Sequence, residues 1–317
     1  MATAKMPKLQ EKLSTIILAA GIGKRMKSKT PKVLHRIMGK PIISFVVEVA
    51  QDLGSTQTIL VVSDRSDPFY ELFGDTVCYA IQSEPLGTGD AATKGLRKAE
   101  HPNVLILCGD VPLLQHSTIV HLIEHHRSQH ADVTILTCQM NDPFGYGRIL
   151  RDPTGRVTEI VEQTDASPEQ QEITEINAGV YYGNTEAIMS ALGEITADNK
   201  QGEYYLTDAI RRIAEKGKLV AGYKIDRAEE ITGINTKQQL AHAWGLVKRR
   251  WFDLLMERGV YIEDPATTNI DLSVRIGNSV NIRPYSLIEG NTVISDGTTI
   301  GPFVWIRDGK IIYSSRA

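Results

Sequence analysis

Residues 15–26 read TIILAAGIGKRM, a short apolar run that leads directly into a glycine loop. The run is too short for the core of a secretory signal, so it predicts a buried β-strand. The loop is expected to open a helix. Glycines let backbone N–H groups approach a polyphosphate closely, and a helix N-terminus favours negative charge. This pattern predicts an α/β fold with a phosphate site at the end of the strand.

The alternation of apolar runs and amphipathic stretches continues through the first two thirds of the chain. Strands are predicted at Thr15–Leu18, Thr58–Val62, Val104–Leu107 and Val133–Thr137. Helical patterns lie between them, at Ile42–Leu53 and Ser117–Gln129. This alternation predicts a Rossmann-like, mostly parallel sheet with helices on both faces, and such sheets bind ligands at the carboxyl ends of their strands. Because Asp110 closely follows the third strand, we expect it at that edge.

The last part of the chain follows a different period. From Lys237 to about Arg258 apolar residues recur at helical spacing, which predicts a long linking helix. After Pro265, isoleucine recurs every six residues, at Ile270, Ile276, Ile282, Ile288, Ile294, Ile300, Ile306 and Ile312. A six-residue unit of one short strand and one turn predicts a parallel β-helix. The predicted division is a first domain at 1–236, a linking helix at 237–262 and a β-helix at 263–317.

Composition and charge are those of an ordinary globular protein. The chain has 317 residues, of which 42% are hydrophobic and 23% charged, and its net charge is −3. This charge argues against nucleic acid or an anionic membrane as a partner, and no stretch approaches the roughly 20 apolar residues that span a bilayer. Cys78, Cys108 and Cys138 lie in apolar segments without CxxC spacing, so we expect buried free thiols in a reducing cytoplasm.

Two common phosphate-loop motifs do not fit the glycine loop. The dinucleotide fingerprint needs a third glycine where Met26 stands, and the Walker loop needs GK followed by Ser or Thr. What remains is a loop with its own cations, Lys24 and Arg25, and with Lys32 behind Pro31. Fixed cations counter the charge that develops on a leaving pyrophosphate. Taken alone, a tight turn with solvated lysines explains the loop equally well.

One further pattern suggests a different chemistry. Residues 121–125, HLIEH, fit the H-x-x-E-H signature of some zinc proteases. Such a site needs a third protein ligand, and a protease leaves every other motif unexplained. We interpret the segment as a solvated, polar face of a helix.

A set of motifs in a fixed order along the chain makes the interpretation of the glycine loop specific. In chain order these are residues 18–35 (LAAGIGKRMKSKTPKVLH), 82–89 (QSEPLGTG), 109–113 (GDVPL), 145–149 (GYGRI), 160–162 (IVE), 176–179 (INAG), 201–208 (QGEYYLTD) and 233–235 (GIN). The set resembles the sugar-nucleotide pyrophosphorylases. Within them it is most similar to the bacterial bifunctional N-acetylglucosamine-1-phosphate uridylyltransferase/glucosamine-1-phosphate acetyltransferase family. The resemblance covers essentially the whole chain and is far more specific than any one motif.

The resemblance implies a nucleotidyltransferase domain followed by a left-handed β-helix, and it assigns roles to residues. The family's nucleotide-binding positions fall on Leu18, Ala19, Ala20, Gly21, Gly23, Lys32, Gln82, Gly87 and Thr88. Catalytic positions fall on Arg25, Lys32 and Asp110. Asp110 and Asn235 fall on the positions that hold Mg²⁺, a hard cation that takes oxygen ligands and bridges phosphate oxygens. Without the resemblance, a lone Gly-Asp after a strand is more often a turn.

Base and sugar recognition are assigned in the same way. The uracil edge is read at Gln82, Gly87 and Thr88. The sugar-binding positions fall on Gly147, Glu162 and Asn177. An amide side chain with backbone groups can match the donor–acceptor pattern of a base, and carboxylate and amide groups suit sugar hydroxyls. In isolation, Glu162 is equally a strand-end residue and Gly147 a hairpin glycine.

The implied reaction condenses UTP with N-acetylglucosamine 1-phosphate to UDP-N-acetylglucosamine and pyrophosphate in the cytoplasm. The sugar phosphate attacks the α-phosphorus in line, so no nucleophilic residue is needed. This agrees with the lack of a convincing Ser/His/Asp or Cys/His constellation. The alternatives are the same chemistry with another sugar 1-phosphate or nucleotide, a non-catalytic sugar-nucleotide-binding protein, and an acyltransferase.

The sequence departs from the family pattern in three places. Cys108 stands where some relatives carry a tyrosine, and Asp90 stands where a histidine is common; both could alter base or sugar preference. The β-helix is short, and the later coils that build the acetyl-CoA site between subunits of a trimer are missing. We therefore expect no acetyltransferase activity, and the trimer is a weaker expectation. The open final coil is expected to be capped by the last residues or by another subunit.

Overall fold

In a computed structural model of the chain, residues 12–21, 23–63 and 67–314 are described. The chain forms two compact units: residues up to 33 together with 45–233, and residues 34–44 together with 234–317. The sequence-based division placed 34–44 in the first domain and separated the linking helix from the β-helix, whereas here all three belong to the second unit. The ends of the predicted division, 1–11 and 315–317, lie outside the described residues.

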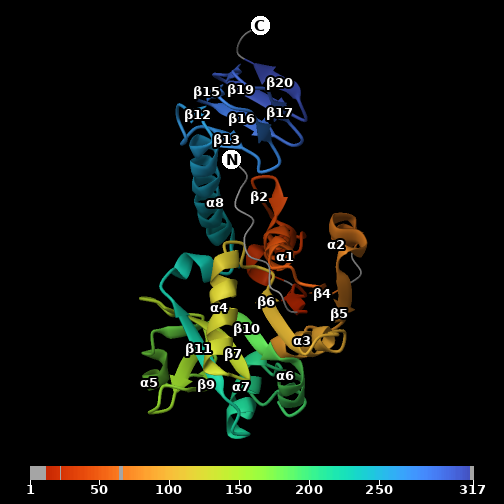
Figure 1. Cartoon of the computed structure of the whole chain (residues 1–317), viewed down its shortest axis with the longest axis vertical. Coiled ribbons are helices and arrows are strands. Elements are labelled where there is room, and N and C mark those ends of the chain that lie inside the picture. The colour runs from red at the N-terminus through yellow and green to blue at the C-terminus, as the bar shows by residue number, and fades with distance from the viewer. Residues whose placement is uncertain (1–11, 22, 64–66, 315–317) are drawn as a thin grey trace. The chain divides into compact units, whose positions relative to one another are not determined.

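The first unit is built on a nine-stranded, mostly parallel sheet, as predicted (Figure 1). Its strands are β1 (Ser14–Leu18), β4 (Gln57–Val62), β5 (Cys78–Ile81), β6 (Asn103–Cys108), β7 (Val133–Gln139), β8 (Arg148–Arg151), β9 (Val157–Val161), β10 (Glu175–Asn184) and β11 (Val220–Ile225). The main order is β11-β7-β10-β6-β1-β4-β5, and β8 pairs with both β10 and β9. β10 runs antiparallel to β6 and β7, whereas β6, β1, β4 and β5 run parallel. All four predicted strands are present.

The order of these strands reverses beside β1. β1 lies between β4 and β6, and the chain moves outward to β5 before it returns to the other side of β1 at β6. Crevices at such reversals are where open α/β sheets bind ligands. Leu18 is in register with Cys108, and the N–H of Gly109 donates to the carbonyl of Leu18 at 2.9 Å. The glycine loop after β1 and Asp110 after β6 therefore start side by side.

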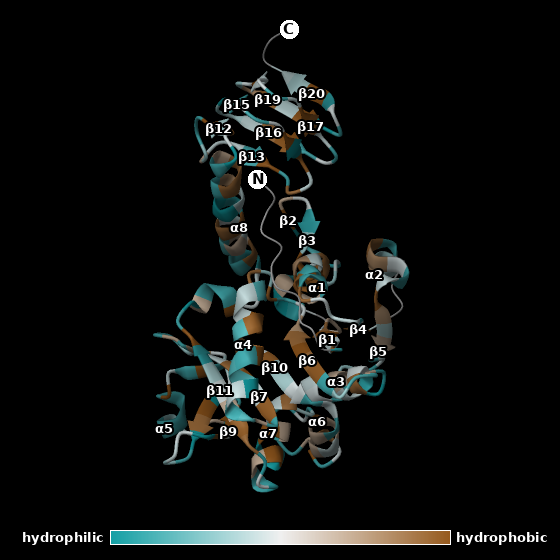
Figure 2. Cartoon of the chain, in the orientation of Figure 1, coloured by the Kyte–Doolittle hydropathy of each residue, from teal (hydrophilic) through white to brown (hydrophobic). Residues whose placement is uncertain are grey.

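Helices cover both faces of the sheet. They are α1 (Ile42–Asp52), α2 (Asp67–Phe73), α3 (Thr88–Leu96), α4 (His116–Gln129), α5 (Pro168–Gln171), α6 (Thr185–Leu192) and α7 (Leu206–Glu215). α3, α6 and α7 contact one another, while α4 packs on β7, β10 and β11. Small residues let α3 approach the sheet closely, since a Cβ at Gly95 would lie 2.5 Å from Ile16 Cγ2. Figure 2 shows hydrophobic residues concentrated in central strands such as β6 and β7.

The second unit contains a parallel β-helix that follows α8 (Lys237–Glu257), as predicted. Its strands are β12 (Tyr261–Ile262), β13 (Asn269–Ile270), β14 (Arg275–Ile276), β15 (Asn281–Ile282), β16 (Ser286–Glu289), β17 (Val293–Ile294), β18 (Thr299–Ile300), β19 (Val304–Arg307) and β20 (Lys310–Ser314). They form three sheets, β12-β15-β18, β13-β16-β19-β20 and β14-β17. Partners such as Ile270 and Ile288, or Ile282 and Ile300, are three hexads apart, so each coil holds three hexads.

A short hairpin from early in the chain completes the second unit. β2 (Arg36–Ile37) and β3 (Lys40–Pro41) pair antiparallel around a turn at Met38 and Gly39, both with positive φ. Met38 is buried, and its carbonyl accepts a hydrogen bond from the N–H of Leu272 at 3.2 Å. A Cβ at Gly39 would lie 2.7 Å from Asp271 Oδ2, so the turn requires glycine there.

The last hexad predicted from the sequence is wrong. Ile312 lies in β20, which turns back antiparallel onto β19, and its side chain is 49% exposed. The reversal occurs at Asp308-Gly309, both with positive φ (50° and 72°), which is the geometry of a two-residue hairpin turn. The last described residues thus cap β19, which is the first of the two expected arrangements, capping by the chain itself or by another subunit.

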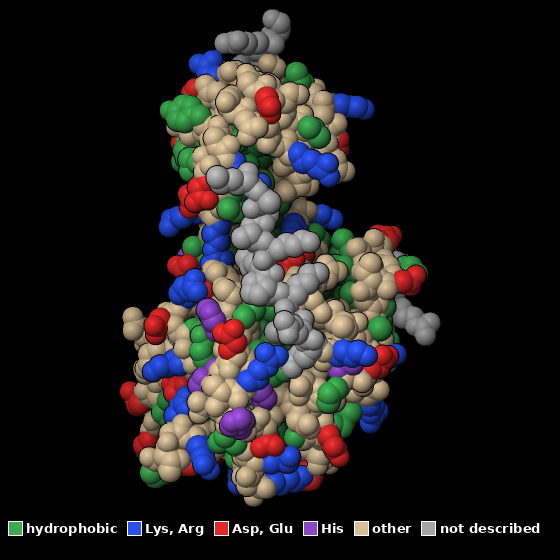
Figure 3. All heavy atoms as spheres, in the orientation of Figure 1, with side chains coloured by type: hydrophobic (Ala, Val, Ile, Leu, Met, Phe, Trp, Pro, Cys, Tyr) green, Lys and Arg blue, Asp and Glu red, His purple; other side chains and the backbone are tan. Residues whose placement is uncertain are grey.

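One cysteine prediction is also wrong. All three cysteines are free; Cys138 is buried and Cys108 is partly exposed, but Cys78 is exposed because β5 is the outermost strand of the sheet. Among the described residues, no helix is long and apolar enough to cross a membrane. Figure 3 shows acidic and basic side chains interspersed on the face in view.

Candidate nucleotide and sugar site

A lysine and an aspartate meet where the strand order reverses. Asp110 follows β6, and Lys32 begins the short 3₁₀ helix η2 (Lys32–Leu34). Lys32 Nζ lies 2.5 Å from Asp110 Oδ2, and the two side chains are 13% and 16% exposed. Gly23 lies against the same lysine, since a Cβ at Gly23 would stand 2.6 Å from Lys32 Cβ. The fold therefore brings the glycine loop, a cation and a carboxylate to one place.

The prediction that the glycine loop opens a helix is wrong. Only a three-residue 3₁₀ helix, η1 (Lys24–Met26), follows the loop. Lys27 then adopts a left-handed conformation with φ 48°, which ends the helical geometry, and the next α-helix begins at Ile42. Favourable charge at this loop must therefore come from individual backbone amides and side chains rather than from a helix dipole.

Several backbone amides of the loop are available to a ligand. The N–H of Ala19 donates to the carbonyl of Val61 at 2.8 Å and is not one of them. The N–H groups of Ala20, Gly21 and Gly23 donate no hydrogen bond to any other residue that the structure describes. Ile22, in the middle of the loop, lies outside the described residues.

Arg25 is not drawn into the Lys32–Asp110 pair. Both Lys24 and Arg25 are exposed, and within the described part of the chain Arg25 makes no ion pair. The catalytic role of Arg25 stays a prediction.

The base-recognition residues form a second group after β5. Gln82 is only 5% exposed, and its Nε2 donates to the carbonyl of Gly87 and to Asp90 Oδ2, both at 3.0 Å. Lys94 Nζ lies 3.5 Å from the other oxygen of Asp90. The amide of Gln82 is thus held by two partners.

The loop around Gly87 is joined to residues 204–206. The N–H of Gly89 donates to the carbonyl of Tyr204 at 2.7 Å, and the N–H of Leu206 donates to Thr88 Oγ1 at 3.0 Å. Gly87 has φ 112°, and a Cβ there would lie 2.4 Å from the carbonyl oxygen of Tyr204. Only glycine fits this position.

The three predicted sugar-binding residues also lie together. The N–H of Asn177 donates to the carbonyl of Gly147 at 2.9 Å, and a Cβ at Gly147 would lie 3.6 Å from either carboxylate oxygen of Glu162. Thr207 Oγ1 donates to Glu162 Oε1 at 2.9 Å. Asn177 begins an irregularity in β10 that ends at Tyr181, whose hydroxyl accepts a hydrogen bond from Asn177 Nδ2 at 2.7 Å.

Cys108 ends β6, two residues before Asp110. The pKa of its thiol is raised to about 12, mainly by burial and also by the charges of Asp110 and Glu162, while the charge of Lys32 lowers it. Its Sγ donates to the carbonyl of Gly179 at 3.4 Å. A thiol with such a pKa stays protonated at neutral pH and is not a nucleophile. The charges of Asp110, Lys32 and Glu162 thus all act on this thiol.

The predicted metal ligands fall in different units. Asn235 belongs to the second unit, so its pairing with Asp110 stays a prediction. Asp110 Oδ1 makes no hydrogen bond within the described residues and is a suitable oxygen ligand for a hard cation. No three His, Cys, Asp or Glu side chains among the described residues are grouped so that they could hold a metal.

The zinc-protease pattern finds no support in the described residues. His121 and Glu124 are exposed on α4, and His125 is half-buried with its ring 5.4 Å from that of Tyr223. Among the described residues, these side chains belong to no group of three that could hold a metal ion. The segment is the polar helix face that we expected.

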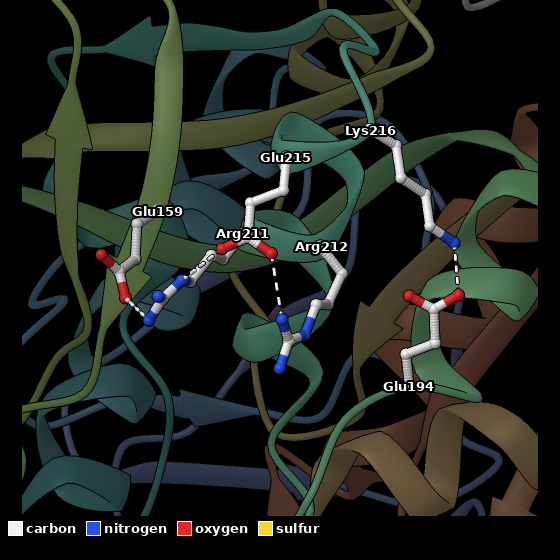
Figure 4. A network of polar contacts seen from close by, with 6 residues as sticks. All are labelled: Glu159, Glu194, Arg211, Arg212, Glu215 and Lys216. Carbon is white, nitrogen blue, oxygen red and sulfur yellow. Dashed lines mark hydrogen bonds and ion pairs between the residues drawn. The ribbon is translucent and has the colours of Figure 1, made fainter.

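An exposed ionic network holds α7 beside the sugar residues. Arg211 reaches Glu159 on β9 (3.5 Å) and Glu215 (2.9 Å), and Arg212 also reaches Glu215 (3.0 Å) (Figure 4). Lys216 lies 2.5 Å from Glu194 after α6. Exposed pairs such as these contribute about 0–1 kcal/mol each to stability. They make Glu159 a suitable control position for Glu162.

Sequence reasoning missed two residues that hold the predicted ones in place, Thr207 and Tyr181, and it named Asp90 without its partner. Thr207 holds Glu162, Tyr181 holds Asn177, and Asp90 holds Gln82. Thr207 lies within the motif 201–208, so its hydroxyl at the start of a helix was a usable signal. The partners of Tyr181 and Asp90 depend on side-chain directions that no local pattern specifies.

Replacement of Gly23 by alanine is expected to destabilise the chain. An L-residue in the left-handed region costs about 1–2 kcal/mol, and the new Cβ would collide with Lys32 Cβ. Gly21→Ala is the matched control for stability, because its Cβ would meet nothing within 4 Å. Thermal unfolding should show a lower Tm for Gly23→Ala than for Gly21→Ala; equal Tm values would contradict the close packing of the loop on Lys32.

Similarity to known proteins agrees with this geometry. The MobA-like NTP transferase domain family matches residues 15–173, which include the glycine loop, Lys32 and Asp110. The chain is 45% identical over 302 residues to the bifunctional protein GlmU of Caldanaerobacter subterraneus subsp. tengcongensis, covering 95% of this chain and 66% of that protein. It is 40% identical over 298 residues to the GlmU of Halalkalibacterium halodurans, covering 93% and 66%.

A third relative extends the alignment further. The chain is 43% identical over 337 aligned residues to the bifunctional protein GlmU of Acetivibrio thermocellus, which covers 95% of this chain and 73% of that protein. The chain spans about two thirds of the length of the first of these relatives (66%). The similarity thus includes both units.

Proposed function

The chain belongs to the GlmU family, whose first part here is a MobA-like NTP transferase domain, and we propose from this membership that it is a uridylyltransferase. The proposed reaction joins UTP to N-acetylglucosamine 1-phosphate and releases UDP-N-acetylglucosamine and pyrophosphate. The observation that carries the proposal is the convergence of Gly23, Lys32 and Asp110 at the strand-order reversal.

In this reaction a phosphate oxygen of the sugar substrate forms a bond to the α-phosphorus of UTP. The bond from that phosphorus to the bridging oxygen of pyrophosphate breaks, and the leaving group takes the electron pair. The amides of Ala20, Gly21 and Gly23 are placed to bind triphosphate oxygens, and Lys32 adds a fixed positive charge. Such preorganised donors act where charge develops in the transition state.

The proposed cofactor is Mg²⁺, with Asp110 as its protein ligand in the first unit and Asn235 as the second predicted ligand. When bound, the cation would neutralise charge on the phosphates. Lys32 and Asp110 already form a close ion pair (2.5 Å). This pair holds the carboxylate in a fixed direction before any substrate arrives.

The sugar is proposed to bind at Gly147, Glu162 and Asn177. A side chain at position 147 would fill the space in front of the Glu162 carboxylate. Glu162 accepts from Thr207 at one oxygen and can accept from a sugar hydroxyl at the other. The Asn177 amide donates to Tyr181 and its oxygen accepts from the N–H of Gly179 at 3.0 Å, so its orientation is fixed.

A substrate panel tests the proposal directly. Pyrophosphate release should be measured with UTP and N-acetylglucosamine 1-phosphate, glucose 1-phosphate or a galactosamine derivative, each with and without Mg²⁺. We expect the highest kcat/KM for N-acetylglucosamine 1-phosphate and dependence on the metal. A preference for another sugar would favour the nearest alternative, and binding without turnover would favour a non-catalytic sensor.

Replacement of Glu162 by glutamine is expected to weaken sugar binding but stabilise the free chain. Burial raises the pKa of Glu162, while its hydrogen bond from Thr207 lowers it and the charges of Asp208 and Asp165 raise it. A carboxyl group whose pKa is higher in the folded chain than in the unfolded chain costs stability when it ionises. The folded chain therefore loses stability as the pH rises from the ordinary pKa through the raised pKa. Loss of a charged hydrogen-bond partner should raise the KM for the sugar phosphate by about tenfold or more.

The two halves of this prediction need separate measurements. Without substrates, the Tm of Glu162→Gln should exceed that of the parent chain above the raised pKa, and the difference should vanish at acid pH where both side chains are neutral. Glu159→Gln, on β9 shortly before Glu162 and in the exposed network, should change neither KM nor the pH dependence of Tm. An unchanged sugar KM in Glu162→Gln would remove Glu162 from the sugar site.

The trimer and the cytoplasmic location stay predictions. The proposed partners are UTP and a sugar 1-phosphate.

A further inference from the structure

The amide nitrogen of Gln82 is fully used by the protein. Its two hydrogens go to the carbonyl of Gly87 and to Asp90 Oδ2, both at 3.0 Å. A carbonyl and a carboxylate oxygen only accept, so the amide must present its nitrogen to them and not its oxygen. This fixes the orientation of an amide, which atom positions alone often leave open. Gln82 Oε1 makes no hydrogen bond to any other residue in the described part of the chain.

Asp90 is held in position for this contact rather than for helix capping. It lies three residues after Gly87, the residue that precedes α3, where an acidic side chain commonly reaches back to the preceding backbone N–H. Here the carboxylate turns to Gln82 instead, and its second oxygen lies 3.5 Å from Lys94 Nζ. The backbone N–H of Gly87 donates to no other described residue. The loop therefore leaves one acceptor, Gln82 Oε1, and one donor, the Gly87 N–H, for a ligand.

We propose that Asp90 is a specificity-determining positioning residue, which locks Gln82 as a pure acceptor and so selects a base edge that carries an N–H. The inference rests on the proposed use of Gln82 in nucleotide recognition. Uracil has a hydrogen on N3 and carbonyl oxygens beside it, which match the acceptor and donor that the loop offers. Cytosine has no hydrogen on N3, so its ring nitrogen would face the lone pairs of Oε1. A site built for a particular hydrogen bond strongly rejects a ligand that cannot make it.

Removal of the carboxylate frees Gln82 to turn. In Asp90→Ala the amide keeps only the Gly87 carbonyl and can present its nitrogen to the base. The kcat/KM for UTP should fall and the ratio of kcat/KM for UTP to that for CTP should narrow by about tenfold or more, the effect of one hydrogen bond to a charged group. Asp90→Asn keeps an accepting oxygen, so its ratio should stay within about threefold of the parent value, since it loses charge but not the contact.

The experiment measures kcat/KM with UTP, CTP and 3-methyl-UTP, which lacks the N3 hydrogen, for the full chain and for Asp90→Ala, Asp90→Asn and Lys94→Ala. Lys94 contacts only Asp90 Oδ1, the oxygen that does not contact Gln82. Lys94→Ala should therefore keep the parent ratio of kcat/KM for UTP to that for CTP. The parent chain should reject 3-methyl-UTP as strongly as CTP, a result that needs no variant to fold.

Three outcomes would overturn the inference. If kcat/KM falls equally for UTP and CTP in Asp90→Ala, the role of Asp90 is merely structural. Ready use of 3-methyl-UTP by the parent chain would show that Gln82 does not read the N3 hydrogen. If the parent chain makes no UDP-sugar from UTP, the proposed function fails and the inference falls with it; if UTP is used and the ratio does not move, the inference alone fails.

Discussion

Asp110→Ala is expected to leave the fold intact and to lower kcat by at least about 100-fold, the scale of losing one preorganised electrostatic group at a reacting phosphate. The side chain is 16% exposed, and its contact with Lys32 lies at the edge of the sheet, outside the apolar core. Its removal takes away the carboxylate that would hold the cation, but it leaves the packing of β6 unchanged. Asp110→Asn, which keeps the shape and loses the charge, should be nearly as inactive.

The measurement is pyrophosphate release at saturating UTP and sugar phosphate over a range of Mg²⁺ concentrations, together with thermal unfolding. Asp198→Ala is the control, since Asp198 is exposed and makes no hydrogen bond within the described residues. A native Tm combined with a large loss of kcat would support the assignment. Unchanged turnover in Asp110→Ala would remove it.

Lys32→Met should lower kcat/KM by about 100- to 1,000-fold, because a fixed cation beside the phosphates stabilises the charge of the transition state. Methionine keeps much of the length of the side chain, so the packing of Gly23 against its Cβ is retained. Lys32→Arg should recover only part of the activity, because a planar guanidinium cannot take the place of a compact ammonium group in a close pair.

Lys29→Met is the matched control, since Lys29 is an exposed lysine of the same segment. Steady-state kinetics of both variants, and of Lys32→Met combined with Asp110→Asn, form a double-mutant cycle. Substitutions of residues in direct contact have effects that do not add. The fold-loss of kcat/KM in the double variant should therefore be smaller than the product of the fold-losses in the two single variants. Full additivity would show that the 2.5 Å contact has no role in the reaction.

The electrostatic surroundings of the site agree with direct displacement. The charges of Asp110, Lys32 and Glu162 act on the Cys108 thiol, yet burial keeps it protonated, with a pKa of about 12. A buried thiol of this kind cannot serve as a nucleophile at neutral pH. The proposed in-line attack needs no such group.

Local sequence patterns determined much of the fold. Alternating apolar runs predicted the strands, and β1 and β4 begin within one residue of their predicted starts. The isoleucine period predicted the β-helix, whose coils are three hexads long. These features are local, because a strand or a β-helix coil buries residues at a fixed spacing along the chain. At Asp308-Gly309 a hairpin turn interrupts the isoleucine period, so the period wrongly predicted a further hexad at Ile312.

The tertiary structure alone decided which side chains meet. Lys32 and Asp110 are 78 residues apart, and their 2.5 Å contact exists because β6 returns beside β1. The exposure of Cys78 follows from the edge position of β5. The sequence by itself established the family, the elements and the candidate residues, since these depend on residue type and spacing. Partners and side-chain directions, such as the amide of Gln82 turned toward Asp90, depend on strand order and loop conformation, which no spacing encodes.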